Sequence, residues 1–331
     1  MIHHNPSFLP ARPGIIFMGT PDFALPSLEA LMVHGHHVLA VVTQPDRPRG
    51  RSGKPAPSPV KRLVKRLGIT VLQPERASDE SFCERISTFS PDLLVVIAFG
   101  QVLTRQLLDI PTWGGLNVHA SLLPKYRGAA PIQRAVMNGE CGTGLTAMRM
   151  DPGLDTGAIL RQEKTPIGAH ETAGELHDRL AHMAATFLLE TLQLLAEDGI
   201  HETPQDDSLA TYAAKIDRTT GRISWNLPAD QISSLIRGLD PWPGAYTTVN
   251  GKTLKLFSSR VVNVGIADTV PGRVKGQSRE GLLVETGDGV ILLGALQLAG
   301  KKRMRALDFL RGFPLKPGTI LGPGTLIGKK K

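Results

Sequence analysis

The sequence predicts an α/β protein in which a doubly wound, mostly parallel sheet is followed by a small C-terminal β-barrel. Nearly continuous apolar stretches in the first part are typical of parallel strands buried on both faces, and stretches with helical spacing alternate with them. After residue 216, short apolar runs separated by Gly, Asn and Asp indicate the barrel. With 331 residues, 41% of them hydrophobic, the chain is long enough for two ordinary domains.

The elements of the first domain follow one another along the chain. Three buried strands are predicted, at residues 14–20, 38–43 and 92–98. A helix is predicted over residues 26–34, between the first two strands. A longer helix is predicted from about Thr172 to Glu197, because Thr172 and Glu175 have the spacing of a capping box and large apolar residues follow at helical spacing.

The character of the sequence changes after the polar run at residues 201–215, which we interpret as a linker. Helical patterns become scarce, apart from one helix predicted over residues 229–238. Three short apolar runs are predicted as strands of the barrel: residues 254–257, 281–285 and 289–293. We therefore expect a disordered leader over residues 1–13, a first domain over residues 14–200 and a second domain over residues 216–331.

The positive charge of the chain is unevenly distributed. Residues 1–215 hold 20 Lys and Arg against 22 Asp and Glu, a net charge of −2, whereas residues 216–331 hold 18 against 8, a net charge of +10. Within the first part, eight basic residues form a stretch without any acidic residue: Arg47, Arg49, Arg51, Lys54, Lys61, Arg62, Lys65 and Arg66. Two separate segments are therefore suited to a polyanionic partner.

The composition argues against a disulfide-stabilised, zinc-binding, secreted or membrane protein. The two cysteines, Cys83 and Cys141, are far apart and have no partners at metal-ligand spacing, which argues against a disulfide framework and a zinc site and fits a reducing cytoplasm. No stretch approaches a membrane span, and the first residues lack the basic start and apolar core of a signal peptide. We expect a cytoplasmic monomer that does not bind membranes.

Three polar residues form the candidate catalytic site. Asn117 and His119 are two apart in a predicted strand, so their side chains share one face near the carboxyl end, where open α/β sheets bind ligands. Asp155 lies in a glycine-bounded turn that can bring a carboxylate to His119, favouring the imidazolium and fixing its orientation. Taken singly, each residue also has a structural explanation, as a turn cap, a hydrogen-bonded histidine or a turn-initiating aspartate.

Together these residues match the chemistry of formyl transfer to an amine. That reaction needs a hydrogen-bond donor for the oxyanion of a tetrahedral intermediate, and it needs a proton moved from the attacking nitrogen to the departing one. An amide, an imidazole and a carboxylate can supply both functions. Neither a metal ion nor a covalent enzyme intermediate is required.

The sequence resembles the family of formyltransferases that use 10-formyltetrahydrofolate. The resemblance extends from about Gly14 to Gly322 and is carried by four segments: Asn117-Val-His119, Ser121-Leu-Leu-Pro124, Arg127-Gly-Ala-Ala-Pro-Ile-Gln133 and Asp155-Thr-Gly157. It implies the formyltransferase fold, with a Rossmann-like sheet and an OB-like barrel. It also implies catalytic roles for Asn117, His119 and Asp155, and it places Ser121, Leu122, Leu123 and Pro124 against the folate.

Within this family the resemblance is closest to the branch that acts on methionyl-tRNA, which implies initiator methionyl-tRNA as the acceptor. The Pro- and Gly-rich loop after residue 43 resembles the tRNA-binding loop of that branch, and its candidate RNA contacts are Arg47, Arg49, Arg51 and Lys54, with Arg51 expected to contribute most. The basic C-terminal domain adds four candidates for phosphate contacts: Lys301, Lys302, Arg303 and Arg305.

Three other functions were compared with this hypothesis. A nicotinamide-dependent oxidoreductase fits poorly, since the turn after Gly19 lacks spaced glycines and Pro21 removes an amide donor. A sugar-amine formyltransferase would share the three catalytic residues but has no evident need for the basic loop. An RNA-binding module without enzymatic activity suits the charge of the C-terminal domain but leaves the first domain unexplained.

Overall fold

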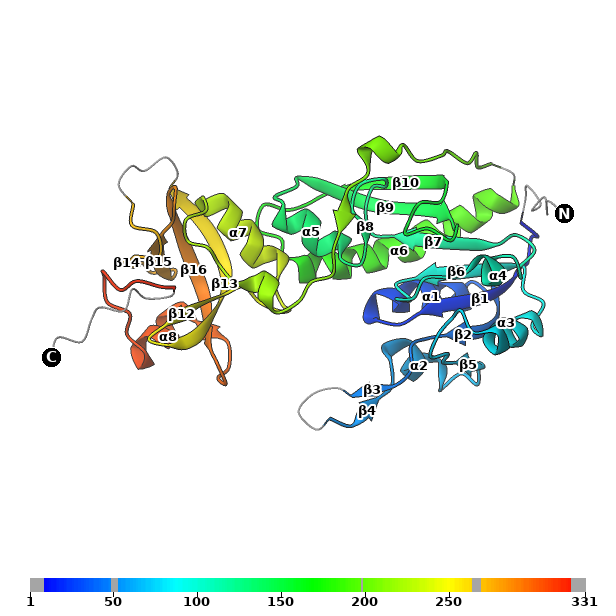
Figure 1. Cartoon of the computed structure of the whole chain (residues 1–331), viewed down its shortest axis with the longest axis horizontal. Coiled ribbons are helices and arrows are strands. Elements are labelled where there is room, and N and C mark those ends of the chain that lie inside the picture. The colour runs from blue at the N-terminus through cyan, green and yellow to red at the C-terminus, as the bar shows by residue number, and fades with distance from the viewer. Residues whose placement is uncertain (1–8, 49–52, 198, 264–268, 323–331) are drawn as a thin grey trace. The chain divides into compact units, whose positions relative to one another are not determined.

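The computed structural model describes residues 9–48, 53–197, 199–263 and 269–322, which form two compact units (Figure 1). Among these described residues, unit 1 comprises those within 1–131, 143–166 and 177–214, and unit 2 comprises those within 132–142, 167–176 and 215–331. Of the predicted leader, residues 1–8 lie outside the described part of the chain. Leu9 is buried, and its amide donates to the carbonyl of Leu195 at 3.1 Å, so this residue belongs to the packed part of unit 1.

The core of unit 1 is a seven-stranded sheet with the order β10-β9-β7-β6-β1-β2-β5. Its strands are β1 (Gly14–Gly19), β2 (His37–Val42), β5 (Val71–Leu72), β6 (Leu93–Ile97), β7 (Gly115–His119), β9 (Gly142–Arg149) and β10 (Ile159–Pro166). The pairs β1/β2, β2/β5, β1/β6 and β6/β7 are parallel, and β7/β9 is antiparallel. Because the chain builds outward from β1 in both directions, the prediction of a doubly wound, mostly parallel sheet is confirmed.

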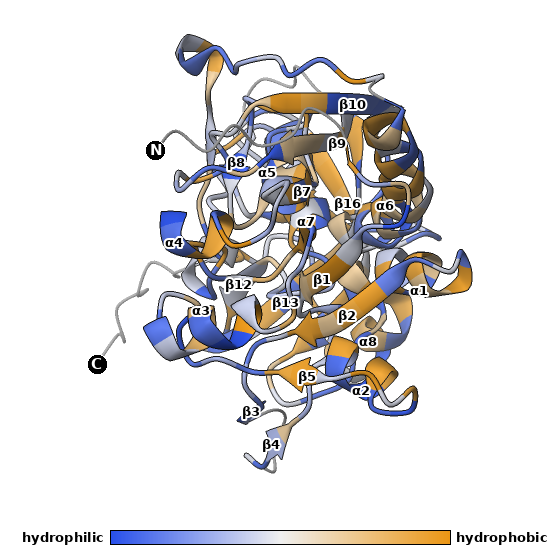
Figure 2. Cartoon of the chain, turned by 90° about the vertical axis from the view of Figure 1, so that its right-hand side faces the viewer, coloured by the Kyte–Doolittle hydropathy of each residue, from blue (hydrophilic) through white to orange (hydrophobic). Residues whose placement is uncertain are grey.

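Both faces of this sheet are buried. Ile16 and Met18 of β1 point to one face, where they join a core cluster with side chains of α3 (Glu80–Ser87) and α4 (Arg105–Leu108). Ile15 and Phe17 alternate with them and are fully buried as well. Figure 2 shows that β1 and β2 are predominantly hydrophobic, as expected for strands buried on both faces of the sheet. The helix predicted after the first strand is α1 (Leu25–Val33).

The long predicted helix is α6 (Ala173–Ala196), and its predicted capping box is present. The amide of Glu175 donates to Thr172 Oγ1 at 3.2 Å, and the amide of Thr172 donates to Glu175 Oε2 at 2.9 Å, which satisfies two N–H groups that the helix itself leaves unpaired. Thr191 interrupts the apolar face of the helix. Its buried hydroxyl donates to the carbonyl of Phe187 at 2.6 Å, so the interruption leaves no unsatisfied polar atom.

Unit 2 contains the antiparallel sheet that the sequence predicts as a small barrel-type domain. Its strand order is β12-β13-β16-β15-β14, with β17 beside β16. The strands are β12 (Tyr246–Val249), β13 (Lys252–Asn263), β14 (Val274–Gln277), β15 (Leu282–Glu285), β16 (Val290–Leu298) and β17 (Met304–Arg305). The helices of unit 2 include α7 (Ala229–Gly238), which has the predicted bounds, and α8 (Ala306–Gly312). Helix α5 (Pro131–Met137) starts at the last residue of the first segment of unit 1, and its other residues belong to unit 2. No helix in the described residues is long and apolar enough to cross a membrane.

Candidate active site

Asn117 and His119 lie at the carboxyl end of β7, on one face of the strand as predicted. His119 is the last residue of β7 and is 7% exposed, whereas Asn117 is half-buried. Leu116 and Val118 alternate with them and are buried. The side-chain amide of Asn117 has no hydrogen-bond partner among the described residues, so its N–H donors are available to a bound group.

The ring of His119 is held between two oxygen atoms. Its Nε2 lies 2.9 Å from the carbonyl oxygen of Tyr126, and its Nδ1 lies 3.6 Å from Oδ2 of Asp155. A carbonyl oxygen can only accept, so Nε2 carries a hydrogen and donates it. Tyr126 is itself fixed, because its amide donates to Thr211 Oγ1 at 2.9 Å. The nitrogen that remains for chemistry is therefore Nδ1, which faces the carboxylate.

The turn between β9 and β10 brings Asp155 to His119, as the glycine-bounded turn predicts. Asp155 has a left-handed backbone with φ of 55°, and its Oδ2 accepts a hydrogen bond from the amide of Gly128 at 2.8 Å. The carboxylate of Asp151 closes the same turn by accepting from the hydroxyl of Thr156 at 2.7 Å. One carboxylate oxygen of Asp155 is thus fixed by the backbone, and Oδ1 has no partner within the described part of the chain.

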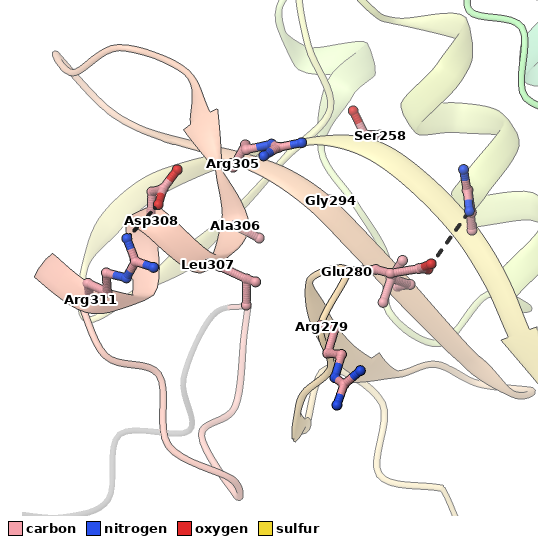
Figure 3. Close-up of a pocket in the computed structure, with 11 residues that line it drawn as sticks. Ser258, Arg279, Glu280, Gly294, Arg305, Ala306, Leu307, Asp308 and Arg311 are labelled. Atoms are coloured by element: carbon pink, nitrogen blue, oxygen red, sulfur yellow. Dashed lines mark hydrogen bonds and ion pairs between the residues drawn. The ribbon is translucent and has the colours of Figure 1, made fainter.

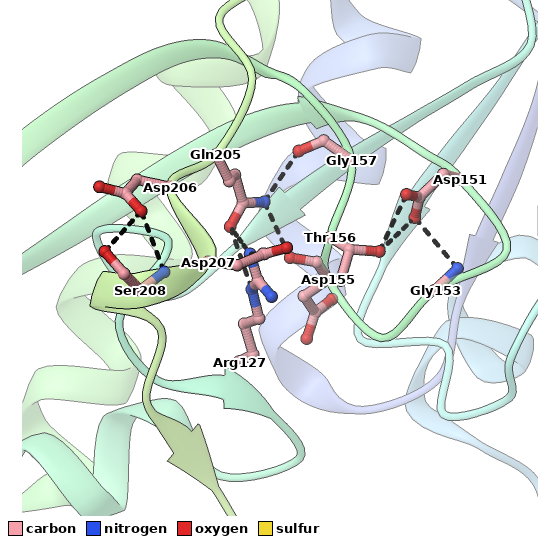
Figure 4. A network of polar contacts seen from close by, with 10 residues as sticks. All are labelled: Arg127, Asp151, Gly153, Asp155, Thr156, Gly157, Gln205, Asp206, Asp207 and Ser208. Atoms are coloured by element: carbon pink, nitrogen blue, oxygen red, sulfur yellow. Dashed lines mark hydrogen bonds and ion pairs between the residues drawn. The ribbon is translucent and has the colours of Figure 1, made fainter.

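A second polar network, formed by Arg127, Gln205 and Asp207, holds this turn through hydrogen bonds to its backbone (Figure 4). Arg127 is 2% exposed and donates to Gln205 Oε1 at 2.8 Å and to Asp207 Oδ1 at 2.7 Å. Gln205 Nε2 in turn donates to the carbonyls of Asp155 and Gly157, both at 2.8 Å. Gln205 and Asp207 belong to residues 201–214, which we call the strap. The strap falls within the linker predicted over residues 201–215, and the sequence carries no signal for its contacts with the site.

A short pair of strands fastens the far end of the strap. In this pair β8 (Arg127–Gly128) lies parallel to β11 (Tyr212–Ala213). Gly128 has φ of 116°, and a Cβ atom there would lie 3.0 Å from the carbonyl oxygen of Ala213. Glycine is therefore needed at the position whose amide binds Asp155.

The segment from Ser121 to Pro124, which follows His119 directly, is rigidly held. The buried hydroxyl of Ser121 donates to the carbonyl of Lys125 at 2.6 Å. The amide of Leu123 donates to Thr146 Oγ1 at 3.0 Å. Leu122 and Pro124 remain partly exposed and offer apolar surface beside the polar site. Across the described residues, no group of three or more His, Cys, Asp and Glu side chains could hold a metal ion.

The predicted basic loop leaves the sheet at the edge on which His119 lies, because β2 and β7 run in the same direction. It forms a hairpin of β3 (Arg47–Pro48) and β4 (Pro55–Ala56), in which Arg47 and Lys54 are exposed. Arg49 and Arg51 lie outside the described residues. At the base of the hairpin, Lys61 donates to Asp46 at 2.8 Å, and this hydrogen bond is the main cause of a lowered pKa of Asp46. Lys61 therefore serves the structure of the loop.

The four basic candidates of unit 2 are all exposed, but they differ in their contacts. Arg303 donates to the buried Asp240 at 2.9 Å and lies over the ring of Phe257, so its guanidinium stabilises unit 2. Arg305 lines a cavity of about 450 Å³ (Figure 3). The same cavity is lined by Arg279, which is not among the residues predicted from the sequence. Lys301 and Lys302 lie at the turn between β16 and β17.

Comparison with known families agrees with this geometry. The formyl transferase family model matches residues 12–192, and the model of the formyl transferase C-terminal domain matches residues 215–314. The chain belongs to the formyltransferase family. The first match contains all of the candidate active-site residues described above except those of the strap, and the second contains the sheet of unit 2.

Several curated relatives are about half identical to this formyltransferase. The methionyl-tRNA formyltransferase of Moorella thermoacetica is 50% identical over 308 residues, which cover 93% of this chain and 99% of the relative. The methionyl-tRNA formyltransferase of Pelobacter propionicus is 51% identical over 308 residues, which cover 93% of this chain and 96% of the relative. The similarity thus includes both units.

Solved structures share the fold at low sequence identity. The sugar 3N-formyl transferase WlaRD has a TM-score of 0.64 at 18% identity and covers 87% of this chain and 98% of its own. HypX from Aquifex aeolicus, solved with tetrahydrofolic acid, has a TM-score of 0.62 at 15% identity and covers 95% of this chain and 51% of its own. These likenesses support the formyltransferase fold and do not distinguish acceptors.

Proposed function

We propose that this formyltransferase moves the formyl group of 10-formyltetrahydrofolate onto the amino group of methionine on initiator methionyl-tRNA, giving N-formylmethionyl-tRNA for translation initiation. The observation that carries the proposal is the side-chain amide of Asn117, which has no partner among the described residues and lies beside His119, whose ring is fixed between Tyr126 and Asp155. The choice of acceptor is supported by the curated relatives, which carry the name methionyl-tRNA formyltransferase at about 50% identity over nearly their whole length.

The reaction begins when the uncharged amine attacks the formyl carbon and a C–N bond forms. The carbonyl oxygen then becomes an oxyanion. Asn117 can donate to this oxygen through its side-chain N–H, which has no partner among the described residues, and the positive charge of His119 as an imidazolium held by Asp155 stabilises the oxyanion electrostatically. Both groups are held by the strand, so little reorganisation is needed as the charge develops.

The second step moves a proton and breaks the bond to the donor. The attacking nitrogen must lose a proton, and N10 of the folate must gain one as its bond to the formyl carbon breaks. Asp155 lies within 3.6 Å of His119 and has one carboxylate oxygen without a partner among the described residues. We assign it two roles: it holds the imidazolium, and it relays the proton, directly or through water.

The substrate contacts follow from the surfaces around this centre. We assign the folate ring to the rigid segment of Ser121, Leu122, Leu123 and Pro124, in which Leu122 and Pro124 offer apolar surface. For tRNA, we assign the acceptor end to the basic hairpin, through Arg47, Arg49, Arg51 and Lys54, and the phosphate backbone to unit 2, through Lys301, Lys302, Arg305 and the exposed edge of Arg303. In this division residues 14–200 perform catalysis and residues 216–331 bind tRNA, in the cytoplasm.

The acceptor is tested by comparing three candidates in one assay. Transfer of labelled formyl from 10-formyltetrahydrofolate is measured with methionyl initiator tRNA, with the same tRNA uncharged, and with an amino-sugar nucleotide. We expect label only on methionyl-tRNA. Label on the amino sugar instead would keep the formyltransferase chemistry and overturn the proposed acceptor.

A further inference from the structure

The side chain of Gln205 is oriented by its chemistry as well as by its packing. Its Oε1 accepts from Nε and Nη2 of Arg127 at 3.1 and 2.8 Å, and its Nε2 donates to the carbonyls of Asp155 and Gly157 at 2.8 Å. Arginine can only donate and a backbone carbonyl can only accept. The reversed amide would therefore place like atoms together at every contact, so one orientation is specified.

The two carbonyls bound by Gln205 lie within the turn that carries Asp155, between β9 and β10. Asp155 has φ of 55°, a left-handed conformation that residues with a Cβ adopt uncommonly. Such a conformation persists only where the surroundings determine it. The hydrogen bonds within the turn come from Asp151, while Gln205 fixes the carbonyls from fifty residues away in sequence.

From this arrangement we propose that Gln205 is a positioning residue for Asp155, and that buried Arg127 sets the direction of its amide. Gln205 touches no reacting atom. It holds the backbone of the turn so that Oδ2 of Asp155 receives the amide of Gly128 and faces His119 Nδ1. Its effect on rate therefore passes through Asp155, and in this form it rests on the proposed function.

The test is Gln205→Glu, which keeps the shape of the side chain. The carboxylate still pairs with Arg127, but it replaces a donor with an acceptor opposite two carbonyls, so the turn must shift. A misplacement of about 1 Å at a catalytic group can cost on the order of 100-fold in rate. We expect kcat to fall by roughly 10- to 100-fold, with KM for both substrates nearly unchanged.

A double-mutant cycle with Asp155→Asn separates positioning from general structural support. If Gln205 acts through Asp155, adding Gln205→Glu to Asp155→Asn lowers the residual rate by less than about threefold. An equal loss in both backgrounds would overturn the proposal. Asp206→Asn is the matched control: Asp206 lies next to Gln205, its side chain accepts only from Ser208 among the described residues, and this variant should keep wild-type kcat.

Hydrogen exchange of the Gly128 amide gives a readout that needs no activity. This amide donates to Asp155, so its exchange should accelerate in Gln205→Glu and not in Asp206→Asn. If the exchange of this amide is unchanged in Gln205→Glu, the positioning role of Gln205 is refuted. This readout does not depend on activity. Failure of the wild type to formylate methionyl-tRNA would instead refute the proposed function. Gln205→Asn, which retains the amide but is too short for both carbonyls, replaces Gln205→Glu if that variant does not fold.

Discussion

Gly157 is the position where the smallest change should disturb the site most. An added Cβ atom would lie 1.7 Å from the carbonyl oxygen of Arg149, whereas real Cβ contacts stay above 3.0 Å. For Gly157→Ala the backbone must therefore open by roughly 1.3 Å, the difference between these distances. Overpacking of this kind costs about 1–3 kcal/mol of stability. Because Asp155 lies two residues away, the shift should also lower kcat by on the order of 100-fold.

The assay is formyl transfer at saturating substrates, with thermal unfolding measured on the same samples. Gly312→Ala is the matched control, since Gly312 ends α8 and an added Cβ there meets nothing within 4 Å. That variant should keep full activity and stability. A Gly157→Ala protein that is folded and retains kcat within threefold of wild type would refute the argument that the turn fixes Asp155.

Two further predictions concern other parts of the chain. Replacing Arg47 and Lys54 together by Ala should raise KM for tRNA, flatten its dependence on salt and leave KM for the folate unchanged; an unaltered salt dependence would count against the hairpin as an RNA contact. In unit 2, the hydrogen bond from Arg273 lowers the pKa of Glu285 from its ordinary value of 4.5. Because the pKa of Glu285 is lower in the folded protein than in the unfolded chain, the ionised carboxylate stabilises the fold above pH 4.5, and this stabilisation is lost as the pH falls through the pKa of the folded state. Glu285→Gln should therefore lower the melting temperature at pH 7. The difference should shrink in acid, and a pH-independent difference would contradict the assignment.

The fold and the placement of the three candidate catalytic residues could be predicted because their signals are local. Apolar runs mark the buried strands, and two-residue spacing places Asn117 and His119 on one face. Glycines around Asp155 mark the turn that delivers it. Each inference needs only a few neighbouring residues, and the structure agrees with all of them.

The supporting contacts could not be predicted because they join distant segments through groups without a sequence signal. Gln205 binds backbone carbonyls, which every residue has, 50 and 48 residues earlier in the chain. The polar composition of the strap is equally typical of a linker, and only the fold shows it packed on unit 1. Likewise, the sequence gives no sign that Arg303 is paired, because its partner Asp240 is 63 residues away along the chain.

The most direct measurement of the catalytic assignment is single-turnover formyl transfer to methionyl-tRNA by wild type and Asn117→Ala, with tRNA affinity measured in parallel. Removing one oxyanion donor typically costs about 100- to 1,000-fold in rate. We expect a loss of that size with unchanged affinity for methionyl-tRNA. A variant that transfers formyl within threefold of the wild-type rate would show that the reaction takes place without Asn117 and that the site is wrongly assigned.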